Sequence, residues 1–115
     1  MIPSTVKAIS VLDRTKEPGS IGEPLYLDVL AALSGTPFGC IPVYTGRYGL
    51  SSKDTTPAQI IAVYRNMETD TPKKRFTIGI VDDVTHLSLE EKENPDTTPA
   101  GTHSCKFWGL GADAP

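Results

Sequence analysis

The segment 46–54, GRYGLSSKD, carries residue types that phosphate-binding loops use: two glycines and a lysine. The amides of a glycine-rich loop can surround a phosphate while a lysine neutralises its charge. The spacing, however, is not that of the GxxxxGK[ST] loop, which cradles phosphates with successive amides. An ordinary loop between a strand and a helix, capped by Asp54 or Thr56, explains these residues better. A small autonomous α/β module that binds a phosphate-bearing ligand through Gly46 to Asp54 is the alternative function.

Asp82, Asp83 and His86 form a second group that could hold a metal or act in acid/base catalysis. Adjacent residues of a strand point to opposite faces, so the two carboxylates need not converge on one ion. A turn after a strand is the simpler interpretation. No GxSxG or GxGxxG pattern is present, so the sequence supports neither a hydrolase triad nor a Rossmann dinucleotide site.

The two cysteines, Cys40 and Cys105, lie far apart and belong to no CxxC or Cys/His spacing. His103 and Cys105 would share one face of a strand, but two ligands do not complete a zinc site. An iron-sulfur cluster is held by several thiolates, so it cannot be assembled from this chain alone. The sequence therefore predicts two reduced thiols, and no catalytic or metal-binding residue.

The pattern of apolar residues predicts that strands and helices alternate along most of the chain. Short runs rich in Val, Ile and aromatic residues predict strands over residues 6–12, 41–48 and 76–81. Helical spacing predicts one helix over 23–33 and a second that begins at a capping box of Thr56 and Gln59 and ends before Pro72. The order predicts an α/β fold, a partial doubly wound and mostly parallel sheet with helices on its faces and right-handed crossovers.

Three loops follow the predicted strands: residues 13–23, 46–54 and 82–86. In a parallel sheet they all fall at the carboxyl-terminal edge, where ligands of such sheets bind. Four cations occupy this edge: Arg14, Lys16, Arg47 and Lys53. Their concentration contrasts with the net charge of -3 of the whole chain. Because Arg and Lys bind carboxylates and phosphates alike, we expect this edge to contact a neighbouring domain or an anionic ligand.

Length and composition restrict the remaining function classes. A chain of 115 residues corresponds to one small domain, and ten prolines with ten glycines indicate many loops. The net charge of -3 argues against a nucleic-acid-binding surface. No stretch approaches the roughly 18 apolar residues of a membrane span, and the first residues lack the pattern of a signal peptide. We therefore expect a soluble, cytoplasmic protein with neither nucleic-acid nor membrane partners.

Five long segments, in order and covering essentially residues 3–113, resemble the large pyruvate:ferredoxin (flavodoxin) oxidoreductases. They are LDRTKEPG (12–19), GEPLYLDV (22–29), GRYGLSSKD (46–54), FTIGIVDDVTHLSL (76–89) and CKFWGLGAD (105–113). The resemblance implies that residues 1–89 are the latter half of a domain similar to the carboxyl-terminal domain of transketolases. Residues 90–104 would be a surface loop or linker, and residues 105–115 the truncated start of the next domain. The sheet would then be incomplete, with an unpaired strand edge.

The resemblance implies a much longer parent enzyme, which oxidatively decarboxylates pyruvate with coenzyme A and passes electrons to ferredoxin or flavodoxin. Its cofactors would be thiamine diphosphate with magnesium and iron-sulfur clusters, and it would be a homodimer. None of the family's thiamine-binding or cluster-binding motifs matches this chain, which departs from the family's GLGxDG continuation at Ala114. We therefore expect a structural and interdomain segment that is inactive alone. Its loop-edge cations would contact a neighbouring domain or, less favoured, the phosphates of coenzyme A.

Overall fold

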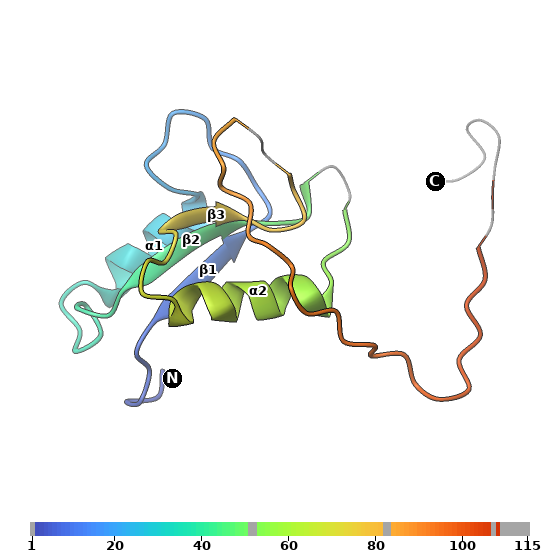
Figure 1. The fold of residues 1–115 in the computed structure, drawn as a ribbon. Helices are drawn as coiled ribbons and strands as arrows, with labels where there is room; N and C mark the ends of the chain where they lie inside the picture. The colour runs from blue at the N-terminus through green and yellow to red at the C-terminus, as the bar shows by residue number, and fades with distance from the viewer. Residues whose placement is uncertain (1, 51–52, 82–83, 107, 109–115) are drawn as a thin grey trace.

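The computed structural model describes residues 2–50, 53–81, 84–106 and 108. Its elements follow in the order β1 (Ile9–Asp13), α1 (Pro24–Leu33), β2 (Val43–Arg47), α2 (Pro57–Glu68) and β3 (Arg75–Thr77). The strands form one parallel sheet in the order β1-β2-β3 (Figure 1). The predicted α/β fold is confirmed, because strands and helices alternate and the sheet is parallel.

The strands are shorter than the apolar runs that predicted them. β1 starts only at Ile9, because the residues before it form a turn in which the amide of Val6 donates to the carbonyl of Pro3 at 3.2 Å. β3 ends at Thr77, shortly before Gly79, whose φ of 67° is left-handed rather than extended backbone. The strand predicted over residues 76–81 is therefore too long, although Ile78 still belongs to the hydrophobic core.

Residues of each strand alternate between the two faces of the sheet, and each face has its own helix. On one face Tyr44, Phe76 and Val63 of α2 form the main hydrophobic core, against which Leu12 packs. On the opposite face, the side chain of the next residue, Asp13, accepts amides at the start of α1. Figure 1 shows the same arrangement, with α2 in front of the sheet and α1 behind it.

The connections between strands depart from the expected geometry. The order β1-β2-β3 moves in one direction across the sheet, while α1 and α2 lie on opposite faces. Two such crossovers have opposite hands, so the expectation that both are right-handed is wrong. The physical reason lies in the core: Tyr44 and Phe76 need a cover on the face opposite α1, and α2 supplies it.

The helices begin and end near the predicted residues, through different contacts. In α2 the predicted capping box is present: the Thr56 hydroxyl accepts the amide of Gln59 at 3.4 Å, and the Gln59 side chain accepts the amide of Thr56 at 3.3 Å. In α1, Pro24 occupies the first turn as predicted, but Glu23 at the N-cap makes no capping hydrogen bond through its side chain. The start of α1 must therefore be stabilised from elsewhere.

Residues 90–104 contain no helix or strand and are exposed. Figure 1 shows this segment passing α2 and then leaving the sheet. By its sequence the apolar run 105–112 could form a last strand, but it falls largely outside the described residues. The division of the chain at residues 89 and 104 stays a prediction.

Candidate functional site

The carboxyl-terminal end of β1 supports the start of α1. The two carboxylate oxygens of the buried Asp13 accept the backbone amides of Leu25 and Tyr26, each at 3.2 Å. These amides are among those that the first turn of a helix leaves without an intrahelical partner. A negative charge at this position also interacts favourably with the helix dipole. Asp13 thus caps α1 across a separation of twelve residues from Leu25.

A buried ion-pair cluster lies beside this helix start. The Glu23 side chain is fully buried, and its carboxylate accepts Nη2 of Arg75 at 3.0 Å and the amide of Glu17 at 2.8 Å. Nε of Arg47 lies 3.6 Å from the same carboxylate oxygen that Arg75 contacts. Within the described residues, the Nε atoms of both arginines are buried without a hydrogen-bond partner. Glu23 alone faces the two guanidinium groups, but Asp13 lies opposite Arg47 in the register of the sheet, so two buried acids accompany the two arginines.

The structure gathers the three loops at one edge of the sheet, as the sequence predicted. Nε of Arg14 donates to the carbonyl of Gly49 at 3.0 Å, which ties the first loop to the second. Nζ of Lys53 donates to the carbonyl of Gly79 at 3.4 Å, which ties the second loop to the third. A shallow cavity of about 420 Å³ lies between them, lined by Lys16, Arg47, Leu50, Thr77, Ile80, Val81 and Val84.

The four cations predicted at this edge are of two kinds. Arg14, Lys16 and Lys53 are exposed, whereas Arg47 is buried and its side chain is directed at Glu23. The alternation along β2 is the signal that could have separated them, since it puts Arg47 on the face of α1. Their role as contacts to a domain or to coenzyme A stays a prediction.

Sequence reasoning missed the acid and the second arginine of the cluster. Glu23 stands just before an apolar helix, where a charged residue reads as an ordinary N-cap. Arg75 reaches it across 52 positions in the sequence, which only the register of β3 against β2 makes possible. The signal in the sequence was a charged residue immediately before the apolar run 76–81, too weak to identify its partner.

The other residues that the sequence singled out do not come together in the described part of the chain. Asp82 and Asp83 lie outside the described residues. His86, His103, Cys40 and Cys105 are all exposed, and the two cysteines are free thiols. Among the described residues, no group of three or more His, Cys, Asp or Glu side chains could hold a metal ion.

The glycines of the segment 46–54 serve the packing of the protein. A Cβ on Gly46 would lie 2.4 Å from Cε2 of Phe76, so the missing side chain makes room for a core ring. Gly49 has a φ of 62°, which favours glycine, and a Cβ there would approach the Arg14 side chain. These contacts explain both glycines without a ligand, and the phosphate-binding alternative is not supported.

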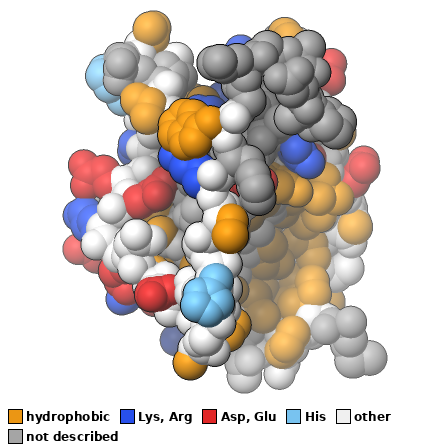
Figure 2. Space-filling view, turned by 90° about the vertical axis from the view of Figure 1, so that its right-hand side faces the viewer, with side chains coloured by type: hydrophobic (Ala, Val, Ile, Leu, Met, Phe, Trp, Pro, Cys, Tyr) orange, Lys and Arg blue, Asp and Glu red, His pale blue; other side chains and the backbone are white. Residues whose placement is uncertain are grey.

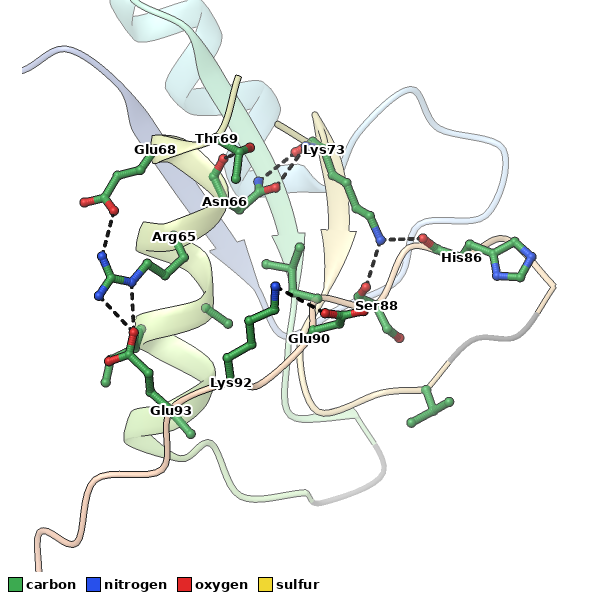
Figure 3. A pocket seen from close by; sticks show the side chains of 15 residues that line it. Arg65, Asn66, Glu68, Thr69, Lys73, His86, Ser88, Glu90, Lys92 and Glu93 are labelled. Carbon is green, nitrogen blue, oxygen red and sulfur yellow. Dashed lines mark hydrogen bonds and ion pairs between the residues drawn. The ribbon is translucent and has the colours of Figure 1, made fainter. Parts of the chain in front are cut away.

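A larger groove of about 770 Å³ runs between α2 and the segment 84–93, where the sequence predicted nothing (Figure 3). On one side of it, Arg65 forms ion pairs with Glu68 at 3.0 Å and with Glu93 at 2.9 Å. Hydrogen bonds with Glu93 and then Glu68 raise the pKa of Arg65 above its ordinary value. On the other side, Nζ of Lys73 donates to two backbone carbonyls at 2.7 and 2.9 Å. Arg65 thus connects this segment to α2, and Lys73 connects it to the chain between α2 and β3.

No family model matches the chain. Individual curated proteins do, over nearly its whole length. A pyruvate:ferredoxin oxidoreductase of Moorella thermoacetica is 56% identical over 113 residues, which are 98% of this chain and 10% of that protein. A pyruvate-flavodoxin oxidoreductase of Enterobacter agglomerans is 49% identical over 113 residues, 97% of this chain and 10% of that protein. A mitochondrial pyruvate dehydrogenase [NADP(+)] of Euglena gracilis is 50% identical over 115 residues, which are 98% of this chain and 6% of that protein.

Identity at this level over nearly all of the chain decides the relationship. The chain is similar over nearly its whole length to one segment of the pyruvate:ferredoxin (flavodoxin) oxidoreductases. The resemblance of the five sequence segments is thereby confirmed. The chain spans about a tenth of the length of the first two relatives. In the described part of the chain, no helix combines the length and apolar character that crossing a membrane requires.

Proposed function

We propose that this chain is a structural and interdomain segment of a pyruvate:ferredoxin or pyruvate-flavodoxin oxidoreductase, which oxidatively decarboxylates pyruvate to acetyl-CoA. The observation that carries the proposal is the match to relatives named for this activity, at 47–56% identity over 97–98% of the chain. Because the chain corresponds to about a tenth of such a protein, its partners are first of all the remaining domains of the enzyme. The segment alone is expected to be inactive.

The relatives differ in the electron acceptor that their names state. Ferredoxin, flavodoxin and NADP(+) appear in the names of relatives that are 56, 49 and 50% identical to this chain. A segment that selects the acceptor should differ most between enzymes with different acceptors, and these identities are nearly equal. We therefore assign ferredoxin or flavodoxin as a partner of the whole enzyme, selected by residues outside this segment.

The whole enzyme would use thiamine diphosphate with magnesium and iron-sulfur clusters, with coenzyme A as a substrate. The chain itself does not fit a cluster, because its two cysteines cannot supply four thiolates. The described residues contain no group of three or more His, Cys, Asp or Glu side chains that could hold a metal ion. No step of the reaction is therefore assigned to this chain. A cytoplasmic location and a homodimeric parent enzyme complete the proposal.

We divide the segment as its sequence suggests. Residues 1–89 would be the latter half of a domain like the carboxyl-terminal domain of transketolases, 90–104 a linker, and 105–115 the start of the next domain. One observation supports the first boundary: the amide of Leu89 donates to the carbonyl of Thr77 at 3.0 Å, so the chain is attached to β3 up to that residue. The exposed residues 90–104 then follow, without helix or strand.

The carboxyl-terminal edge of the sheet would be the contact to a neighbouring domain, made by Arg14, Lys16 and Lys53. Of these cations, Lys16 lines the cavity of this edge together with the buried Arg47, and no acidic residue is among the described lining residues, so positive charge is in excess there. An acidic surface of a neighbouring domain would balance that excess. The phosphates of coenzyme A are the second candidate, and we rank them lower because no phosphate-binding loop accompanies the cations.

The substitutions Lys16→Ala and Lys53→Ala in the full-length enzyme separate these candidates. Loss of a coenzyme contact should raise the apparent KM for coenzyme A about tenfold, if one charged hydrogen bond of about 1.5 kcal/mol is lost. Loss of a domain contact should lower thermal stability and leave that KM unchanged. Lys92→Ala is the matched control, because Lys92 is an exposed lysine of the groove along α2. If all three variants behave alike, the edge is an ordinary solvated surface.

The activity needs its own measurement. The full-length enzyme should reduce ferredoxin or flavodoxin with pyruvate and coenzyme A, whereas the isolated 115-residue chain should be colourless and should not consume pyruvate. A full-length protein without this activity would refute the proposed reaction. Cluster absorbance in the isolated chain would refute the structural role.

A further inference from the structure

The more apolar of the two helices is the less buried one. α1, with the sequence PLYLDVLAAL, contains a single charged residue, Asp28, yet only Leu33 is buried in it. α2 contains both charged and polar residues, and five of its side chains are buried. A surface helix of a globular protein normally has a polar outer face, whereas a helix that is apolar all round is normally buried. α1 combines the composition of a buried helix with the exposure of a surface helix.

The side of α1 that faces away from the sheet is the outer face, consisting of Pro24, Leu25, Asp28, Ala31 and Ala32. All five residues are exposed, and Leu25 keeps 49% of its accessible surface. Ile21, just before the helix, is 87% exposed. Figure 2 views the molecule from the side toward which the strands point, and there hydrophobic side chains gather on the half occupied by α1. Charged side chains gather on the half occupied by α2.

We propose that the outer face of α1 packs against another region of the same, longer oxidoreductase polypeptide, as a second interdomain surface distinct from the carboxyl-terminal edge. This inference rests on the proposed function, because relatives about ten times longer than this chain supply the candidate region. The small side chains of Ala31 and Ala32 allow a close approach of the partner backbone. The partner surface is apolar, with a basic side chain or amide donor opposite Asp28, because a buried carboxylate needs such a partner.

The position of Asp28 favours such a partner over a second copy of the chain. Asp28 lies in the middle of the outer face, between Leu25 and Ala32 along the helix. In a twofold-symmetric contact, residues near the axis meet their own copies. Two Asp28 carboxylates would then approach each other inside an apolar interface, where unpaired charge is costly. A different surface can instead offer a complementary charge.

Thiol labelling of the full-length enzyme tests the proposal. In the variant Ala32→Cys, the new thiol should react at least roughly tenfold more slowly in the native than in the denatured enzyme, because the partner region covers it. Peptide mass analysis separates this thiol from Cys40 and Cys105. Tyr64→Cys is the matched control, since Tyr64 is 61% exposed on α2. Native labelling of position 32 within about twofold of the denatured rate would overturn the proposal.

A charge introduced into the same face gives a second measurement. Leu25→Lys should lower the thermal midpoint of the full-length enzyme by more than Tyr64→Lys does, because only the former places a charge in a covered apolar contact. An equal effect of the two would contradict the proposal. A disulfide between two copies of Ala32→Cys would also overturn it, in favour of a twofold contact. None of these readouts depends on activity, so a protein with another reaction would fail the enzyme assay but not these tests.

Discussion

The helices α1 and α2 cover opposite faces of one sheet, but different kinds of contact fix them. α2 begins at its own capping box and buries a stripe of its own residues against the core. α1 is capped by Asp13 from β1 and lies beside the Glu23 ion-pair cluster. Local sequence therefore determines α2, whereas α1 depends on residues distant in sequence and, by our proposal, on another region of the enzyme. This difference predicts how substitutions on each side will act.

The largest effect is expected for Glu23→Ala. The substitution leaves Arg47 and Arg75 without their common acid, and breaking a buried ion pair typically costs about 3–5 kcal/mol. In urea unfolding of the 115-residue chain, the cooperative transition should move to much lower urea or disappear. Glu68→Ala is the control, because this acid pairs with Arg65 on the exposed surface of α2 and should leave the midpoint unchanged. Equal midpoints for both variants would mean that the cluster does not support the fold.

The next effect is expected for Asp13→Ala, which removes the remote cap of α1. Two helix amides then lose their acceptor, and we expect a loss of about 2 kcal/mol in unfolding free energy. Asp13→Asn keeps one acceptor oxygen and should lose less. Urea unfolding followed by circular dichroism would measure both changes. A loss in Asp13→Asn as large as in Asp13→Ala would show that charge, and not hydrogen bonding, supports the helix start.

The sequence was sufficient where the deciding contacts are local. The capping box of Thr56 and Gln59 involves residues three positions apart, and both the start and the end of α2 follow from such short patterns. The sequence was insufficient where a contact depends on strand register. Glu23 meets Arg75 only because β3 pairs with β2 in one particular alignment. The cations at the carboxyl-terminal edge were predicted from the sequence, whereas the burial of Arg47 was missed, although the alternation along β2 indicates it.

The role of Gly46 and the handedness of the crossovers also depend on contacts between residues that are distant in sequence. Gly46 looked like part of a loop, since nothing nearby in sequence shows that the ring of Phe76 occupies the space of its missing side chain. The handedness of the crossovers depends on which face of the sheet each helix covers. Apolar periodicity predicts that a helix has a buried side, but it does not select the face of the sheet.

A smaller effect is expected for Thr56→Ala at the start of α2. The hydroxyl of Thr56 accepts the amide of Gln59, and loss of such a cap costs about 1 kcal/mol. Thr56→Ser retains the hydroxyl and should stay close to the wild-type chain. Comparison of the urea midpoints with that of Asp13→Ala tests whether the local cap contributes less than the remote one. The reverse order would refute the proposed contrast between the two helices.

The smallest effect is expected for Arg65→Ala. Arg65 forms two ion pairs with Glu68 and Glu93, but its side chain is 63% exposed, so solvent screens the attraction. The pKa of Arg65 is raised, so any stability from its charge is fully present below the ordinary arginine pKa and is lost only as the pH rises through a still higher value. The urea midpoint of Arg65→Ala should therefore match the wild-type midpoint at any pH from about 5 to 9, and added salt should not separate them.

A drop comparable with that of Thr56→Ala would show that the segment 84–93 is held to α2 mainly by these ion pairs. The contacts of Lys73 with backbone carbonyls would then contribute little, contrary to the arrangement in Figure 3.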